Sequence, residues 1–512
     1  MRDSGLSVPM TATLARPAAP TLPGPLVTIC SLLALLSTAA VVLVAALGSP
    51  LKDDVAWLLY VAGQWLGGQR LYIDLVEINP PLIVWLSAIP AWLADWAGLA
   101  PKSVALPLFV VCILGASWWT ASLLRDASPL FRDRLAVFAL IGTVLLGVAG
   151  PELGQREHLL IAAWLPYLCL LARSLGGDRV RLGPLVAAGV LAGLGCALKP
   201  RYVLVFAALE MLALTRGLRP WRPAVLAGAA TLASYAAAIM LLYPAYLERA
   251  VPLGIALYSA TDVPFSFMLY DNVSVMLGEA AVLLLWWPGR RTREGNLVLV
   301  LGVFAIASTL VCFIDGKNWF YHRLPATIAT VLALLCWVAS ALARSAPERR
   351  RLGVQLLVAL AALTTFGIAA AGRLRPEVEL ACSPELSTEA RLEKLIRRER
   401  AKTYMAFSEW IALGFPVVNN TGVVWASRFD SMWALKGELW RARFDPDAHR
   451  EWPVRRWVAR DFVAGCPDLA VVDTRESLNY IAVLSVSDPA FASAWSQYRQ
   501  IAAFDGLRVY KH

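Results

Sequence analysis

Two adjacent carboxylates, Asp53 and Asp54, follow the first long apolar segment of the chain. A short aromatic stretch comes after them, and Glu77 then stands just before the proline pair Pro80 and Pro81. Adjacent acids at the surface of a membrane are costly unless they are solvated, paired or used in a reaction. A carboxylate in such a position could take the proton of a hydroxyl group. We therefore treat Asp53 and Asp54 as catalytic candidates.

More polar residues gather at the ends of later apolar segments, on the side of the membrane where Asp53 and Asp54 would lie. With Glu77, the candidates for substrate binding are Arg156, Glu157, His158, Lys199, Arg201, Lys317, Tyr321, His322 and Arg323. Cations in such a set could stabilise a departing phosphate while a carboxylate deprotonates the attacking hydroxyl. The combination indicates a site for phosphate binding and hydroxyl activation.

The composition indicates a helical membrane protein with many spans. Of the 512 residues, 58% are hydrophobic and 16% are charged, whereas about 25% are charged in typical soluble domains. The net charge of +10 would suggest a nucleic-acid partner for a soluble protein. Here most arginines stand in short loops between apolar segments, which is the positive-inside signature of membrane proteins. We therefore expect a lipid bilayer as the partner, and no nucleic acid.

Apolar segments of about 20 residues can cross a bilayer, and the chain has about eleven segments that approach this length. They are residues 26–47, 103–124, 135–149, 158–173, 184–198, 202–215, 223–243, 273–287, 297–313, 324–343 and 352–371. Every loop that this order places inside carries two or more arginines. The N-terminus is then cytoplasmic, and the polar candidates and the C-terminal region lie on the outer side.

Four regions follow from this pattern. Residues 1–25, rich in proline and alanine, are expected to be a disordered cytoplasmic tail. A transmembrane domain covers 26–372, with a catalytic outer loop at 48–102 that forms helices along the membrane surface. Residues 376–512 are predicted to be a periplasmic α/β domain, because a charged helical stretch at 389–402 accompanies strand-length apolar runs at 415–418 and 469–473.

The eight cysteines lack metal-binding spacing such as C-x-x-C. Six of them lie in or at the ends of apolar segments, where we expect them to pack. Cys382 and Cys466 lie in the C-terminal region. A disulfide between these two is left open, since the periplasm permits one.

Several of these motifs resemble the GT-C superfamily of membrane glycosyltransferases, which includes the protein O-mannosyltransferases and the lipid A aminoarabinose transferases. The resemblance rests on the acid pair at 53–54, on Glu77-x-Asn79-Pro80-Pro81, and on the segments 154–158, 193–200 and 317–325. It covers about residues 1–370 and does not extend to the C-terminal region.

The resemblance implies an inverting transfer of a sugar from a polyprenyl monophosphate to a hydroxyl of a cell-envelope acceptor, which could be a glycan, a lipid or a protein. The reaction would take place on the periplasmic side of a bacterial inner membrane. Asp53 would be the base, and Arg156 and Lys199, with residues of 317–323, would hold the leaving phosphate. Asp54 stands where the mannosyltransferases carry Glu, and Asn79 where they carry His. The sugar, the acceptor and a divalent metal ion near Asp53 and Asp54 are therefore open.

Each candidate also has a simpler interpretation. Asp53 or Asp54 could cap a helix that begins near Val55, since Asp is a favoured N-cap residue. Glu77 could form a surface ion pair with Arg70, worth about 0–1 kcal/mol.

Three more candidates have such alternatives. Lys199 could be an anchor that reaches toward the membrane surface. Residues 156–158 could be an ordinary polar start of a span, and His322 an ordinary interface residue.

Three other functions are compatible with a polytopic chain. A ligase or polymerase of lipid-linked glycans would more often place its chemistry in a late outer loop, but residues 244–272 carry few cations. A lipid-glycan transporter or flippase would carry charges in mid-span, and only Glu210 and Glu279 are candidates for that. A scaffold of an envelope assembly would make the one-sided polar set accidental.

Overall fold

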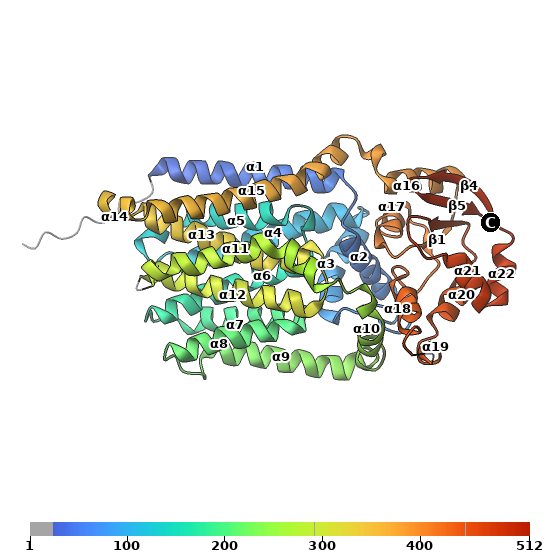
Figure 1. The fold of residues 1–512 in the computed structure, drawn as a ribbon, viewed down its shortest axis with the longest axis horizontal. Helices are drawn as coiled ribbons and strands as arrows, with labels where there is room; N and C mark the ends of the chain where they lie inside the picture. The colour runs from blue at the N-terminus through green and yellow to red at the C-terminus, as the bar shows by residue number, and fades with distance from the viewer. Residues whose placement is uncertain (1–23, 291, 446) are drawn as a thin grey trace, which may run out of the picture.

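The computed structural model describes residues 24–290, 292–445 and 447–512. A bundle of long helices forms one part of the molecule, and a small domain built on a β-sheet lies at one end of it (Figure 1). The expected disordered tail, residues 1–25, lies outside the described residues except for its last two. Gly24 and Pro25 lead directly into the first helix.

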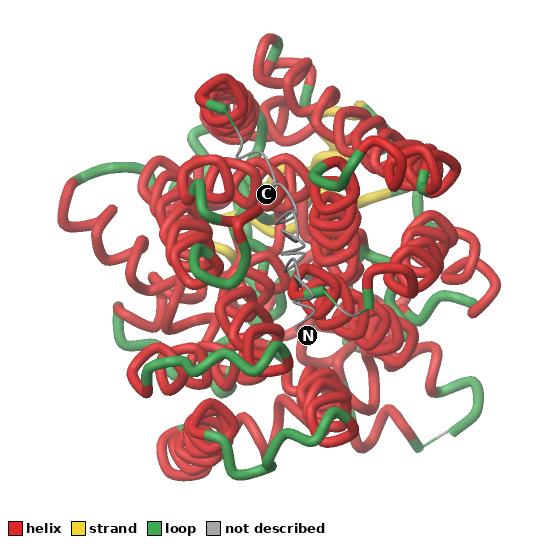
Figure 2. Tube along the Cα trace, turned by 90° about the vertical axis from the view of Figure 1, so that its left-hand side faces the viewer, coloured by secondary structure: helices red, strands yellow, loops and turns green. Residues whose placement is uncertain are grey.

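Each of the eleven expected segments forms a helix. These helices are α1 (Pro25–Gly48), α4 (Pro101–Leu124), α5 (Arg134–Ala149), α6 (Arg156–Leu175), α7 (Leu182–Leu198), α8 (Val203–Thr215), α9 (Pro223–Leu242), α11 (Phe265–Gly289), α12 (Arg293–Asp315), α13 (Phe320–Leu342) and α15 (Gly353–Cys382). Among the described residues, nine helices are long and apolar enough to cross a membrane, as expected of a multi-pass membrane protein. With 17 and 13 residues, α7 and α8 are shorter than the roughly 20 that a span needs. Figure 2 views the bundle from the end opposite to the sheet domain.

Glycines let α7 and α9 lie close together. A Cβ atom added at Gly189 would stand 2.1 Å from the carbonyl oxygen of Ala224, and one at Gly193 would stand 2.7 Å from that of Gly228. Small residues at helix crossings in membranes allow such close approach of two backbones. The two glycines thus hold α7 close to α9, and Lys199 follows directly after α7.

The segment after α1 forms two shorter helices, α2 (Asp53–Leu66) and α3 (Pro81–Ala97). As expected, they lie at one end of the bundle, and it is the end that carries the sheet domain (Figure 1). Asp53 and Asp54 occupy the first turn of α2, where the helix dipole favours negative charge. Neither acid is the cap residue, because the helix begins at Asp53 itself and Lys52 precedes it.

The C-terminal sheet has five strands in the order β2-β1-β3-β5-β4. They are β1 (Thr403–Phe407), β2 (Val424–Trp425), β3 (Leu469–Asp473), β4 (Arg499–Phe504) and β5 (Leu507–Lys511). The first three strands in that order are parallel, and the pairs β3–β5 and β5–β4 are antiparallel. The accompanying helices are α16 (Thr388–Glu399), α17 (Val417–Thr421), α18 (Trp433–Arg441), α19 (Ala448–Glu451), α20 (Val454–Gly465), α21 (Tyr480–Ser487) and α22 (Pro489–Trp495).

The local predictions for this domain have different outcomes. The charged stretch 389–402 is largely α16, and the run 469–473 is β3, so both are confirmed. The strand predicted at 415–418 is wrong, because α17 begins within it. Its apolar side chains are buried against α2, where the ring of Phe415 lies 4.9 Å from that of Trp57. In addition, α15 continues past residue 376 to Cys382 before the sheet domain begins.

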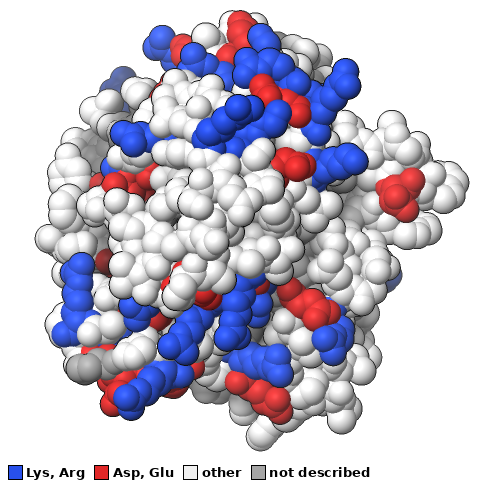
Figure 3. Space-filling model, turned by 90° about the vertical axis from the view of Figure 1, so that its right-hand side faces the viewer, with Lys and Arg blue, Asp and Glu red and all other residues white. Residues whose placement is uncertain are grey.

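The sheet domain packs directly on the bundle. The rings of Tyr258 and Trp433 lie 5.2 Å apart, and Asn419 Nδ2 donates to the carbonyl of Ala56 at 3.0 Å. Close approach also occurs at Gly437, where an added Cβ would stand 2.3 Å from the carbonyl oxygen of Leu257. On the outer end of the domain, charged side chains of both signs gather in two regions with a largely uncharged stretch between them (Figure 3).

Candidate functional site

A cavity of about 750 Å³ lies between the bundle and the sheet domain. Its wall brings together nine of the twelve residues that the sequence singled out: Asp53, Asp54, Glu77, Arg156, Lys199, Arg201, Lys317, Tyr321 and His322. The other three, Glu157, His158 and Arg323, lie outside this wall. Most of the predicted polar set therefore shares one space, although its members are up to about 270 positions apart in the sequence.

The two acids at the start of α2, Asp53 and Asp54, have different hydrogen-bond and ion-pair partners. Asp53 Oδ1 lies 3.7 Å from Lys52 Nζ and accepts a hydrogen bond from the backbone of Asp54 at 2.9 Å. Asp54 Oδ2 accepts from Gln155 Nε2 at 3.3 Å. Burial, and next the charge of Asp53, raise the pKa of the Asp54 carboxyl to about 7. At neutral pH the pair can therefore either hold or release a proton.

Glu77 is fixed in the segment between α2 and α3. Its carboxylate accepts from Trp57 Nε1 and from the backbone N–H of Asn79, each at 2.6 Å, and burial raises its pKa. The alternative that Glu77 pairs with Arg70 is wrong. Arg70 pairs with Asp74 on the surface, with 2.9 Å between Nη2 and Oδ1.

Arg156 begins α6 and lines the cavity. Its guanidinium donates to the side-chain oxygen of Asn79, and it forms no ion pair within the described residues. A guanidinium has five N–H donors, so several remain for a ligand. The contact with Asn79 joins the start of α6 to the segment between α2 and α3.

Lys199 sits at the centre of a buried charged cluster. Its Nζ lies 2.9 Å from Glu157 Oε1 and 2.7 Å from Asp315 Oδ2. Arg201 also pairs with Asp315, and His322 lies within 3.9 Å of Glu157 and 3.7 Å of Asp315. The alternative that Lys199 is a surface anchor is wrong, since it is only 9% exposed and is paired twice. The cluster joins α6, α12 and α13 to the segment after α7.

The remaining predicted residues divide between the cavity and its surroundings. Lys317 lines the cavity. Its Nζ donates to the carbonyl of Tyr258 and to Asp262 Oδ1, each at 2.5 Å. His158 is buried in the bundle, with Nδ1 3.5 Å from the backbone N–H of Gly154. Arg323 donates to the carbonyl of Asp271 outside the cavity. Neither His158 nor Arg323 therefore lines the site.

Two parts of the cavity wall were missed by the sequence analysis. The first belongs to residues 244–272, which form a π-helical turn (Tyr246–Ala250), α10 (Val251–Leu257) and a 3-10 turn (Tyr258–Thr261). The second belongs to the sheet domain and consists of Glu409, Trp410, Ile411, Asp430, Ser431, Trp433 and Lys436. Neither part shows a motif in the sequence. The residues of the sheet domain reach the cavity only because that domain packs on α2 and α10.

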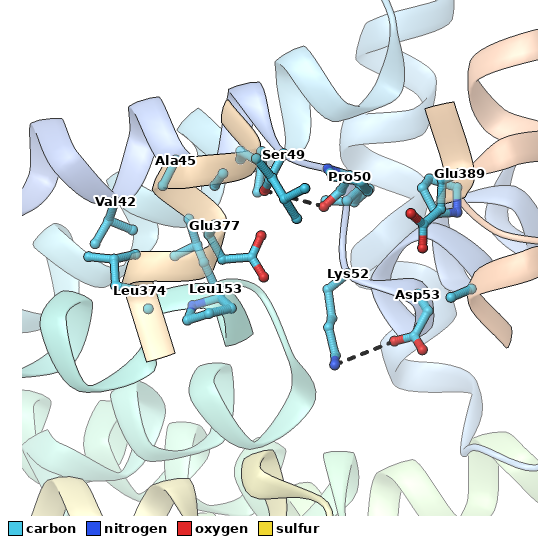
Figure 4. Close-up of a pocket in the computed structure, with 18 residues that line it drawn as sticks. Val42, Ala45, Ser49, Pro50, Lys52, Asp53, Leu153, Leu374, Glu377 and Glu389 are labelled. Carbon is cyan, nitrogen blue, oxygen red and sulfur yellow. Dashed lines mark hydrogen bonds and ion pairs between the residues drawn. The ribbon is translucent and has the colours of Figure 1, made fainter. Parts of the chain in front are cut away.

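A second cavity of about 190 Å³ lies beside the first and shares Lys52 and Asp53 with it. Figure 4 shows Lys52 extending toward Asp53, with Glu377 of α15 and Glu389 of α16 on either side. Asp53 therefore stands between two spaces, whereas Asp54 lines only the larger one.

The remaining predictions concern metal, sulfur and mid-span acids. Within the described residues, no three His, Cys, Asp or Glu side chains are grouped to hold a metal ion. The thiols of Cys382 and Cys466 are free and exposed. Glu210 pairs with Arg222, and Glu279 accepts from Thr309 Oγ1 at 2.6 Å, so both mid-span acids have partners.

No protein-family model matches the sequence, and no curated protein matches it significantly.

Proposed function

We propose that this protein is an inverting glycosyltransferase that moves a sugar from a polyprenyl monophosphate to a hydroxyl of a cell-envelope acceptor. The observation that carries the proposal is the cavity in which the acid pair of α2 faces Arg156, a cation with no ion pair in the described chain. A base and a phosphate-binding cation are the two groups that this reaction needs.

The size and position of the cavity support the same proposal. A volume of about 750 Å³ is within the range of roughly 300–1,000 Å³ that is usual for small-molecule sites. The cavity lies at the end of long apolar helices, so a lipid-linked donor could place its head group in the cavity and its chain in the bilayer.

The proposed step is a single displacement. Asp53 takes the proton of the acceptor hydroxyl, and the oxygen forms a bond to the anomeric carbon. The bond between this carbon and the phosphate oxygen breaks, and its electron pair leaves with the polyprenyl phosphate. Arg156, together with Lys199 of the same cavity wall, stabilises the charge that develops on the phosphate.

We further propose that the chain lies in a bacterial inner membrane with the cavity on the periplasmic side. The support is the arginine content of the loops at the other end of the bundle, such as Arg349, Arg350 and Arg351 of α14 (Ala346–Arg351). Cytoplasmic loops of membrane proteins carry such an excess of basic residues.

The test is donor turnover by the purified full-length protein in nanodiscs. A panel of polyprenyl-phosphate sugars is incubated with a crude envelope extract as acceptor, with and without a divalent cation, and released polyprenyl phosphate is measured by mass spectrometry. Asp53→Asn is compared with Asp74→Asn, which removes an acid of the same outer segment that is bound to Arg70 at the surface.

The expected result is release that falls about 100-fold or more in Asp53→Asn and stays at the wild-type level in Asp74→Asn. Wild-type rates in Asp53→Asn would show that the base is wrongly assigned. Failure of every donor, together with tight binding of a lipid diphosphate, would favour the ligase instead. Transport of an intact lipid-linked sugar without cleavage would favour the flippase.

A further inference from the structure

The sheet domain supplies one wall of the cavity with a set of groups that the proposed donor chemistry does not use. This wall includes Glu409, Trp410, Asp430, Ser431 and Lys436. The acids of α2 line the same cavity, so a molecule bound at this wall would share that space with the base.

Ser431 is a buried hydroxyl that faces the cavity without a partner. The residue is 2% exposed, and its Oγ makes no hydrogen bond within the described chain. Nearly all buried polar groups in proteins are hydrogen-bonded, so an unpaired hydroxyl in a cavity wall is available to a molecule bound there. The Ser431 hydroxyl can donate a hydrogen bond to such a molecule or accept one from it.

Only one of the two carboxyl oxygens of Asp430 accepts hydrogen bonds within the described chain. Its Oδ1 accepts from the backbone N–H of Ser431 and from Trp433 Nε1, each at 2.7 Å, while Oδ2 has no partner in the described chain. Burial, and next the charge of Glu77, raise the pKa of this carboxyl to about 8. A carboxyl that is protonated at neutral pH can both donate and accept, as a ligand hydroxyl does.

Two partly exposed tryptophan side chains, Trp319 and Trp410, also line the cavity. Trp410 of the sheet domain is 49% exposed and Trp319 of the bundle is 40% exposed, and their ring centroids lie 5.8 Å apart at an interplanar angle of 78°. Large aromatic side chains that remain exposed beside a cavity are suited to stack against a ligand with an apolar face. The ion pair of Lys436 with Glu409 adds donors and acceptors next to them.

We infer that this wall is a carbohydrate-binding subsite and that the acceptor of the proposed transfer is therefore a glycan. A sugar ring presents hydroxyl groups around its edge and a C–H face above and below, which matches polar groups flanked by indoles. A peptide or a simple lipid acceptor lacks this combination. The inference rests on the proposed function, since it identifies the bound sugar as an acceptor.

The first experiment measures binding without turnover. The full-length protein in nanodiscs is applied to an array of neutral oligosaccharides. The variants are Trp410→Ala and Ser431→Ala, and the matched control is Trp440→Ala, which removes an indole of α18 that is 40% exposed and does not line the cavity. The expected result is binding to a subset of glycans that weakens about tenfold in the two cavity variants, equivalent to about 1.4 kcal/mol, and is unchanged in the control.

The second experiment separates this inference from the proposed function. Thermal unfolding in nanodiscs should be the same in Trp410→Ala and in the wild type, which shows that the variant is folded. With a glycan acceptor, KM for the acceptor should rise about tenfold while KM for the donor stays constant. Donor turnover in a protein that binds no array glycan, or binds equally well as Trp410→Ala, overturns the glycan assignment alone. Absence of donor turnover in the wild type overturns the proposed function.

Discussion

The carboxyl groups around the cavity are held in distinct ways, and the differences determine what each can do. Glu77 is occupied by an indole and a backbone N–H, so it positions the segment between α2 and α3. Asp53 has a lysine beside it, whereas Asp54 faces a neutral amide. Burial and the charge of Asp53 raise the pKa of Asp54 to about 7, so the charge of this carboxyl changes near neutral pH.

The first prediction concerns the pH dependence of transfer. The raised pKa of about 7 means that Asp54 is largely protonated at pH 6 and largely ionised at pH 8. If the ionised pair supports proton removal, transfer should rise about tenfold between these two values. Initial rates at fixed saturating donor across pH 5.5–9 measure this.

The control for this pH profile is Asp54→Asn. The asparagine keeps a side-chain oxygen that can accept the hydrogen bond from Gln155, but it does not titrate. Its rate should be lower and should lose the rise centred near pH 7. A profile of the same shape in the wild type and in Asp54→Asn would assign the titration to another group.

The second prediction concerns the cation of the phosphate site. Arg156→Ala should lower kcat/KM for the donor about 100-fold or more, because it removes a preorganised donor to the leaving group. Arg156→Lys should recover only part of this loss, since an ammonium cannot reproduce the planar fork that contacts both Asn79 and a phosphate. The comparison is Arg70→Ala, at the surface of the same outer segment. Equal losses in Arg156→Ala and Arg70→Ala would argue against a phosphate site at Arg156.

At the scale of elements, the bundle half of the site was predictable and the sheet-domain half was not. Long apolar segments are recognised as helices, and arginine-bearing loops fix which ends of those helices lie together. That is why Asp53, Arg156 and Lys199 could be placed on one side from the sequence. Asp430 and Ser431 carry no such signal, because only the packing of the sheet domain brings them to the cavity.

Tertiary packing also explains the local errors. The run at 415–418 has the composition of a buried strand, but Phe415 fills a space against Trp57 of α2. Burial alone cannot distinguish the two arrangements in a short apolar run. His158 and Arg323 were expected at the cavity from their positions in polar motifs, but the rotation of α6 and α13 turns them elsewhere.

The third prediction tests the crossing of α7 and α9. Gly189→Ala should lower the melting temperature by several degrees, because the new Cβ would meet the carbonyl oxygen of Ala224 at 2.1 Å and overpacking of this kind costs about 1–3 kcal/mol. The matched control is Gly183→Ala in the same helix, where nothing lies within 4 Å of the added Cβ. Thermal unfolding in nanodiscs measures both. Equal melting temperatures would mean that α7 and α9 are farther apart than described.

At the scale of the whole molecule, two features lie at opposite ends. The sheet domain, which contributes to the cavity wall, occupies one end, and the arginine-rich helix α14 lies at the other (Figure 1). A donor that is carried in the membrane would reach the cavity from the bilayer, while the sheet domain would meet a water-soluble acceptor. Both substrates would then meet at the acids of α2.

The last prediction follows from this polarity. If the positive-inside pattern fixes the orientation, the exposed thiol of Cys466 in the sheet domain faces the periplasm. In a Cys382→Ser background, a membrane-impermeant maleimide should label Cys466 in intact cells, and Cys466→Ser should abolish that labelling. Ala346→Cys adds an exposed thiol at the arginine-rich end, and it should react only after the cells are opened. Labelling of Ala346→Cys in intact cells with protection of Cys466 would invert the topology and place the cavity on the cytoplasmic side.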